Sequence, residues 1–194
     1  MKPLTFFTAA ALSLTLALPA KAACDDPAGP NVNWSGCSTQ MADLYEADLS
    51  GADLSDADLE SATLSGAKLS GANLTFAKLM FANLSGANLT GADLTNAYLF
   101  KANLDGANLT DAKLIYVNLT DAELAGVDLS NADLTDANLD TAYMARANLS
   151  GANLTRANLH SAHLDGANLS GAVLTDAIWT DGRQCGEASI GVCK

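Results

Sequence analysis

The chain has 194 residues, with 22 acidic against 10 basic residues for a formal net charge of −12, and it is 49% apolar but only 6% aromatic. The apolar share excludes an intrinsically disordered chain, and the acidity argues against a nucleic-acid binder that relies on a general basic surface. The length fits one domain, but the shortage of aromatic residues argues against an ordinary globular core, in which Phe, Tyr and Trp supply much of the buried area.

Residues 1–22 have the pattern of a secretory signal peptide. Lys2 is followed by a largely apolar run from Leu4 to Leu18 and then by the small-x-small triplet 20–22. The run is shorter than the ~20 apolar residues that a membrane-spanning helix needs. We therefore expect cleavage after Ala22 and a periplasmic or secreted mature protein without a membrane span. Cleavage removes two lysines and no acidic residue, which brings the net charge to −14.

The start of the mature chain does not match a lipoprotein. A lipoprotein signal would place the modified cysteine at Cys24 and an aliphatic residue three positions before it. That position holds Lys21, which is charged. We therefore expect no lipid anchor.

One repeat fills most of the chain. From Ala42 to Asp181 the sequence divides into 28 consecutive pentapeptides without insertion or deletion, with Ala first in 26 units, Leu third in 26 and Asp or Asn second in 18. A period of five would spread the leucines around an α-helix and alternate them across a straight strand. Both difficulties vanish if the chain turns once per repeat. The pattern therefore predicts a β-solenoid whose leucine and alanine ladders fill a core too narrow for aromatic rings.

The repeating unit Ala-(Asp/Asn)-Leu-(Ser/Thr)-x resembles the pentapeptide-repeat protein family. The resemblance implies an all-β fold, a right-handed quadrilateral β-helix with four pentapeptides in each coil. The 28 units then make about seven coils, each rising by ~4.8 Å, and residues 20 apart lie above one another. We expect a signal peptide at 1–22, an N-terminal cap at 23–41, the solenoid at 42–181 and a C-terminal cap at 182–194.

The four cysteines lie outside the repeats, two at each end of this rod. Export favours disulfide formation. A disulfide requires Cα atoms within about 7 Å, and seven coils separate the two ends. We therefore predict the two local pairs Cys24–Cys37 and Cys185–Cys193, which would cap the open ends. The Cys-x-x-Cys spacing of a redox pair is absent.

The outward positions suggest one contact surface. The formal charge of the seven coils, from 42–61 to 162–181, runs −7, +2, 0, −2, −5, +2 and −3. Coils two to four carry most of the outward apolar residues, with Lys78, Lys101 and Lys113 around them. Apolar patches on soluble proteins often mark binding sites, so we predict an interface with a protein partner or a second copy. The alternative is that these large side chains have no function, because the outward positions of the repeat tolerate residues of any size. The patch consists of Phe76, Met80, Phe81, Tyr98, Phe100, Ile115 and Tyr116.

Other candidate sites are weaker. His160 and His163 could join Asp140 at a metal, but the two histidines lie on different faces and a third strong ligand is lacking, so we predict no metal site. A hydroxyl column on one face could bind ice or a polysaccharide. A convex rod without catalytic motifs or a cleft predicts no enzyme and no cofactor. The hydroxyl column consists of Ser50, Ser70, Thr90, Thr110, Ser130, Ser150 and Ser170.

Three candidate functions remain. The resemblance implies a DNA mimic that acts on a type II topoisomerase, and a duplex as long as this rod carries roughly 20 charges against −13 on the repeats. Banded charge and the signal peptide oppose that reading. We favour an exported, non-enzymatic structural or interaction module that presents a rigid surface to a protein or envelope partner. The DNA mimic and the carbohydrate- or ice-binding ladder are the alternatives.

Overall fold

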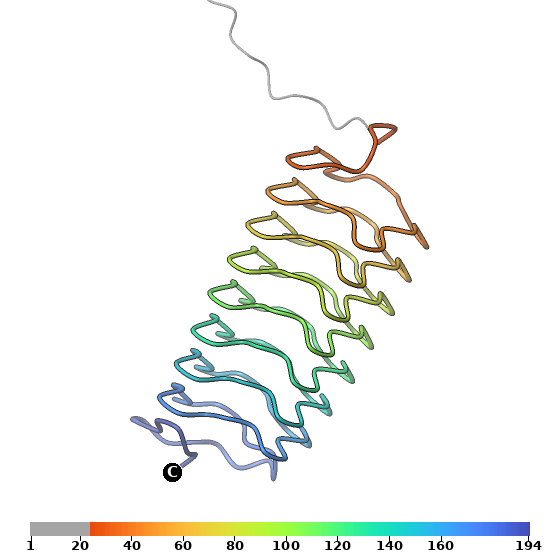
Figure 1. Ribbon diagram of the computed structural model, residues 1–194. Helices are drawn as coiled ribbons and strands as arrows, with labels where there is room; N and C mark the ends of the chain where they lie inside the picture. Colours follow the sequence, from red (N-terminus) through yellow and green to blue (C-terminus); the bar gives the residue numbers. More distant parts are fainter. Residues whose placement is uncertain (1–23) are drawn as a thin grey trace, which may run out of the picture.

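The computed structural model describes residues 24–194, which form a rod of stacked, nearly rectangular coils running from the N-terminal to the C-terminal end (Figure 1). The expected signal peptide lies outside the described residues. Residues 24–194 contain no helix and no strand longer than a single bridge residue. Parallel bridges instead join residues 20 apart, in an unbroken series from Asn33↔Asp53 to Asn158↔Ile178. Each side of a coil thus contributes one bridge to a ladder along the rod.

Leucine and alanine fill the core as the repeat predicts. From Leu49 to Leu159 the third position of every unit is buried with at most 1% of its surface exposed, including Met144, and the first position from Ala52 to Ala157 is equally buried. Each fully buried leucine contributes roughly 1.5–3 kcal/mol. Val117 and Val127 replace alanine without exposing the core. The small first position keeps opposite sides of the coil close together.

The fifth position of each unit makes the corner. Every fifth residue from Glu46 to Asp176 has a positive φ, between 52° and 73°. Glycine adopts this left-handed conformation freely, and Asn and Asp tolerate it better than other residues. The corner therefore explains why Gly, Asp and Asn recur at the end of the repeat.

The Asp or Asn at the second position has a role that the sequence analysis did not identify. Its side-chain oxygen accepts a hydrogen bond from the backbone N–H two residues later, as from Ser50 to Asp48 and from Thr135 to Asp133. The serine or threonine hydroxyl at that later position often donates to the same oxygen, at 2.7 Å for Ser50 and 2.6 Å for Thr135. The polar residues of the motif thus fix the chain as it enters each corner.

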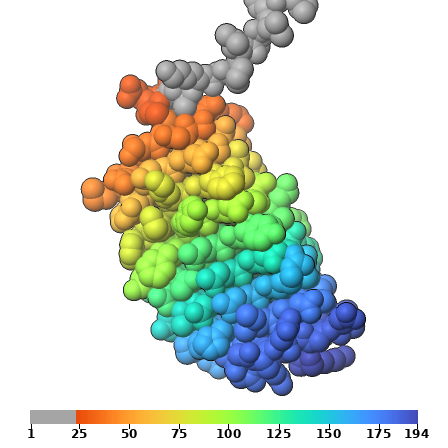
Figure 2. All heavy atoms as spheres, turned by 180° about the vertical axis from the view of Figure 1, so that it is seen from behind, coloured from red at the N-terminus to blue at the C-terminus, as the bar shows by residue number. Residues whose placement is uncertain are grey.

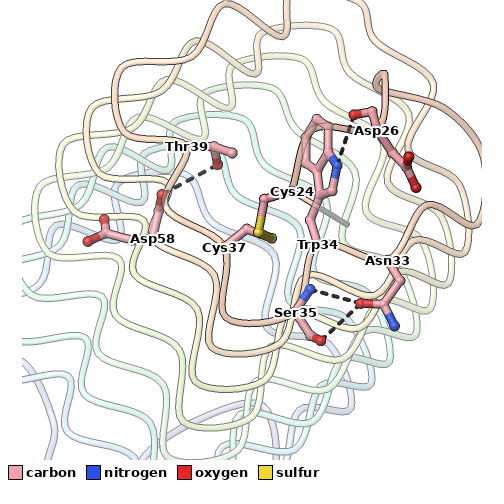
Figure 3. Close-up of a disulfide and its surroundings, with 8 residues drawn as sticks. All are labelled: Cys24, Asp26, Asn33, Trp34, Ser35, Cys37, Thr39 and Asp58. Atoms are coloured by element: carbon pink, nitrogen blue, oxygen red, sulfur yellow. Dashed lines mark hydrogen bonds between the residues drawn. A yellow bond between two sulfur atoms is a disulfide. The ribbon is translucent and has the colours of Figure 1, made fainter. Parts of the chain in front are cut away.

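At the N-terminal end the coil starts before the motif does. Asn33 already pairs with Asp53, within the segment 23–41 that the sequence assigns to a cap. Trp34 occupies the inward position that leucine takes later, and only 5% of its surface is exposed. Its indole N–H donates to the backbone oxygen of Asp26 at 3.2 Å, beside the Cys24–Cys37 disulfide (Figure 3). Within residues 24–194 no bridge precedes Asn33, so an aromatic ring has room at this inward position.

At the C-terminal end the chain folds back on the last coil. Ile190 pairs with Val173 and Gln184 with Ile178, both antiparallel. A second disulfide, Cys185–Cys193, closes this segment. The backbone groups on two sides of the last coil are thereby paired within residues 172–191.

Candidate interaction surface

The predicted patch occupies one long side of the rod. We name the four sides of a coil face A (42–46), face B (47–51), face C (52–56) and face D (57–61), with their equivalents at steps of 20, and number the coils from coil 1 (42–61) to coil 7 (162–181). Because the bridges join residues 20 apart, each face is a grid of rows and columns. Face D lies between the corner column 76, 96, 116 and the corner column 81, 101, 121. We call the seven predicted apolar residues on and beside face D the aromatic patch.

Four members of the aromatic patch are about half exposed. The exposed fractions are 48% for Phe76, 51% for Phe81, 47% for Tyr98 and 59% for Tyr116. The other three members, Met80, Phe100 and Ile115, are half-buried. The most exposed members of the patch are therefore all aromatic.

The structure brings two coils together within the patch. The rings of Phe81 and Phe100 meet edge to face with their centroids 5.7 Å apart. Lys101 places its Nζ 5.1 Å from the centre of the Phe100 ring. Phe76 and Tyr116 share a corner column but are two coils apart, with Asn96 between them, so they mark opposite ends of the patch.

The lysines around the patch are partly neutralised. Lys78 lies 3.8 Å from Asp58, and Lys113 lies 3.4 Å from Asp93, each on the preceding coil. Exposed ion pairs of this kind add little stability. With formal charges of +2 and 0, coils 2 and 3 are the least acidic stretch of the N-terminal half.

Three patch residues sit in an unfavourable backbone conformation. Phe76, Phe81 and Tyr116 are corner residues with φ of 58°, 60° and 57°. The left-handed region costs a non-glycine residue roughly 1–2 kcal/mol. Bulky side chains are genuine exceptions there. The sequence alone could have flagged them, since aromatic residues stand where the repeat favours Gly, Asp and Asn.

A polar network continues the corner column below Tyr116. Arg156 holds Asp136 with two hydrogen bonds, 2.8 Å from Nε and 2.5 Å from Nη2. The hydrogen bonds from Arg156, opposed by a smaller effect of burial, lower the pKa of the Asp136 carboxyl, and the Tyr116 hydroxyl adds to the lowering. The network ties three coils together along the edge of face C and face D.

The rod has only shallow hollows. The side drawn in Figure 2 is closely packed along its length, without a deep cleft. Beside the patch, a hollow of about 370 Å³ is lined by Lys101, Asp121, Glu123 and Tyr143. A larger one of about 610 Å³ lies at the C-terminal end, next to Arg156 and Gln184. Both are open to solvent, and neither gathers catalytic groups of a recognisable kind.

The remaining predicted candidates are engaged with their own neighbours. Hydroxyls of the column on face B bond within the protein, as Thr90 does to Asn88 at 2.7 Å. His160 lies 3.0 Å from Asp140, whereas His163 stacks on Tyr143 with ring centroids 4.9 Å apart. Residues 24–194 contain no cluster of three His, Cys, Asp or Glu side chains suited to a metal. The same part of the chain has no helix long and apolar enough to cross a membrane.

Comparison with solved structures gives several matches, and one of them superposes well. A trypsin-treated variant of QnrB1, a plasmid-mediated fluoroquinolone resistance protein, superposes with a TM-score of 0.63 at 20% identity, over 78% of this chain and 74% of that one. HetL, a pentapeptide repeat protein involved in heterocyst differentiation regulation from the cyanobacterium Nostoc sp. strain PCC 7120, is 33% identical over 79% of this chain and 92% of its own, with a TM-score of 0.27. A pentapeptide repeat protein from the Arabidopsis thaliana thylakoid lumen is 35% identical over 54% and 69%, with a TM-score of 0.32.

The comparison with curated proteins gives no match. A model of pentapeptide repeats matches in 8 copies, over residues 42–79, 77–114, 102–140, 112–151 and 142–178. This match spans well over half of the chain, and the likeness to QnrB1 supports the right-handed quadrilateral β-helix. The chain therefore belongs to the pentapeptide-repeat family.

Proposed function

We propose that the protein is an exported, non-enzymatic interaction module and that the aromatic patch on face D is its contact surface. One observation carries the proposal: aromatic side chains occupy left-handed corners at Phe76, Phe81 and Tyr116, all on the two edges of the same face. Non-glycine residues take this conformation at corners along the whole rod, Glu46 and Arg146 among them, but the aromatic ones in the described part of the chain lie at the two edges of face D. Aromatic residues that the repeat merely tolerates would be expected on all four corner columns.

The rod suits binding because its surface is held in place before a partner arrives. Each coil is bonded to the next through backbone groups, as Tyr98 N–H is to Ala77 O at 2.9 Å. The edge-to-face contact between Phe81 and Phe100 limits the rotation of both rings. Little conformational entropy is then lost on association, which favours affinity.

Export is proposed on two grounds. The N-terminal pattern at 1–22 is that of a signal peptide, and all four cysteines are in disulfides, which persist in oxidising compartments. The two disulfides lie at the ends of the stack, where they would protect unpaired backbone groups from end-to-end association. Fractionation of the producing cells with mass determination of the mature N-terminus tests export and the cleavage site together.

The DNA-mimic alternative receives less support. The charge along the rod is interrupted by coil 2 at +2 and coil 3 at 0, where Lys78 and Lys101 flank aromatic rings. A mimic of duplex DNA needs closely spaced negative charge along its length. A supercoiling assay with a type II topoisomerase tests this alternative, which requires inhibition at micromolar protein.

Photo-crosslinking tests the contact surface directly. A photoreactive phenylalanine analogue is placed at Tyr98, in the centre of the patch, and at Asn108 on face B as the matched control. We expect a crosslinked protein product from position 98 and none from position 108 in the producing cells. Equal crosslinking from both positions, or none from position 98, would contradict the proposed contact surface.

A further inference from the structure

The outward side chains of face D form a regular grid, which allows its self-complementarity to be examined. Rows are coils about 4.8 Å apart. In coil 2 the left corner, centre and right corner are Phe76, Lys78 and Phe81. In coil 3 the corresponding positions are Asn96, Tyr98 and Lys101, as the bridge Lys78↔Tyr98 fixes.

Two copies can set face D against face D about a two-fold axis that lies in the contact plane, across the rods and level with the gap between coils 2 and 3. This axis exchanges the two rows and keeps each column on its own side. It places Lys78 of one copy over Tyr98 of the other, and Phe81 over Lys101. Each patch lysine on face D then meets an aromatic ring of the second copy, an arrangement that is attractive when partly desolvated. The third pair sets Phe76 against Asn96 and introduces no repulsion.

The neighbouring rows agree with this axis. Coil 1 then faces coil 4, which sets Asp56 opposite Tyr116, Asp58 opposite Asn118 and Ser61 opposite Asp121. None of these three pairs sets two acidic side chains against each other.

Other axes fit less well. An axis through coil 3 sets Phe81 opposite Asp121, Lys101 opposite its own copy and Lys78 opposite Asn118, so neither lysine meets a ring. An axis parallel to the rod sets every coil against itself, so that coil 1, with −7, faces another −7. Like charges across an interface cost several kcal/mol or prevent association. The charge bands thus favour the antiparallel arrangement.

We propose that the partner of the aromatic patch is a second copy of this chain, and that two rods lie antiparallel, face D against face D, about the axis between coils 2 and 3. The inference rests on the proposed function, since it names the occupant of the same surface. The dimer buries the four exposed aromatic side chains, which is the largest favourable term available to it.

Sedimentation of the purified mature protein, with a matched pair of variants, tests the energetics. Lys78→Glu reverses a lysine that faces Tyr98 in the dimer, and Lys68→Glu reverses the equivalent lysine on face B. The two lysines are alike, because each lies 3.8 Å from an aspartate of the preceding coil. We expect a dimer for wild type and for Lys68→Glu. For Lys78→Glu we expect a dimer dissociation constant that is about tenfold higher.

Crosslinking of single cysteines tests the direction of the rods. The native cysteines described here are all in disulfides, so a new thiol reacts alone. In the proposed dimer, Asp58→Cys lies opposite Asn118→Cys, and two copies of Asp58→Cys are three coils apart, roughly 14 Å. We expect a short bismaleimide to join the mixed pair and to leave Asp58→Cys alone unlinked.

The outcomes separate the two proposals. A monomer at tens of micromolar, or a self-crosslink of Asp58→Cys, overturns the antiparallel dimer. If position 98 still captures a different protein in cells, the proposed function stands while the dimer falls. If position 98 captures a product of twice the chain mass, both are supported.

Discussion

Phe81 and Phe100 lie 19 residues apart in the sequence, yet their rings meet edge to face at 5.7 Å with an interplanar angle of 83°. Phe81 is the last residue of coil 2, and Phe100 is the last but one of coil 3. The contact therefore joins two neighbouring coils at the edge of face D. It positions the exposed ring of Phe81 and buries part of Phe100. The patch is thus organised by contacts between coils.

Removing the Phe100 ring should loosen the patch. Phe100→Ala deletes the edge-to-face contact, which is worth about 0.5–1.5 kcal/mol beyond area burial. We expect lower thermal stability and weaker dimerisation together. A double-mutant cycle with Phe81→Ala, read by denaturant unfolding, should give a coupling energy in that range, and additive effects of the two changes would contradict the contact.

Replacing a strained aromatic corner should stabilise the fold while it weakens binding. Phe76→Asn puts a residue that tolerates positive φ at a corner with φ of 58°, and Asn96 occupies the same column one coil later. We expect a gain of about 1 kcal/mol, which is about 2–4 °C in Tm for a protein of this size. Phe76→Val, which is worse in this conformation, is the control. A loss of stability in Phe76→Asn would mean that the ring supports the fold and not a partner.

The core should be sensitive in both directions. Leu109→Ala leaves a cavity and should cost about 2–5 kcal/mol. Ala107→Leu overpacks the same unit and should cost about 1–3 kcal/mol. Thr110→Ala, in the same unit but pointing outward, should change stability by about 0.5 kcal/mol or less. Denaturant unfolding of the three variants checks this order, and equal costs for inward and outward changes would contradict a single shared core.

Acid should destabilise the protein below about pH 4. Hydrogen bonds from Arg156 lower the pKa of Asp136, and hydrogen bonds from Ser50 lower the pKa of Asp48. A carboxyl whose pKa is lower in the folded state stabilises that state above its unfolded pKa, near 3.9, and loses this contribution as the pH falls through the folded pKa. We expect Tm to fall between pH 4 and 2. The double variant Asp48→Asn and Asp136→Asn should show a shallower fall, and an unchanged slope would contradict this assignment.

Opening the C-terminal disulfide should weaken that end of the rod. The bridge joins residues 8 apart and closes a small loop, for which a chain-entropy estimate gives roughly 2–3 kcal/mol. We expect Cys185→Ser with Cys193→Ser to increase hydrogen exchange in residues 172–191 first, while coils 2–5 keep their protection. Uniform loss of protection along the rod would show that the ends are not independent of the middle.

The amino-acid pattern alone predicted the repeat period, the inward leucine and alanine ladders, the family and both disulfide pairs. It could do so because every unit meets the same local demand, a small and a large apolar side chain turned inward. It did not place the start of the ladder at Asn33, because Trp34 and Cys37 fill the inward positions there without matching the motif. It also missed the bond from Ser50 N–H to Asp48.

The tertiary structure decided what the outward residues do. Phe81 meets Phe100, and His163 meets Tyr143, because stacking brings residues 19 or 20 apart in the chain onto neighbouring coils. No local preference of the sequence encodes the directions of these side chains. The left-handed corner decided that Phe76, Phe81 and Tyr116 are strained. The sequence determined the core because burial acts on each repeat separately, and only the stacked coils determined the surface, because a surface contact needs two coils at once.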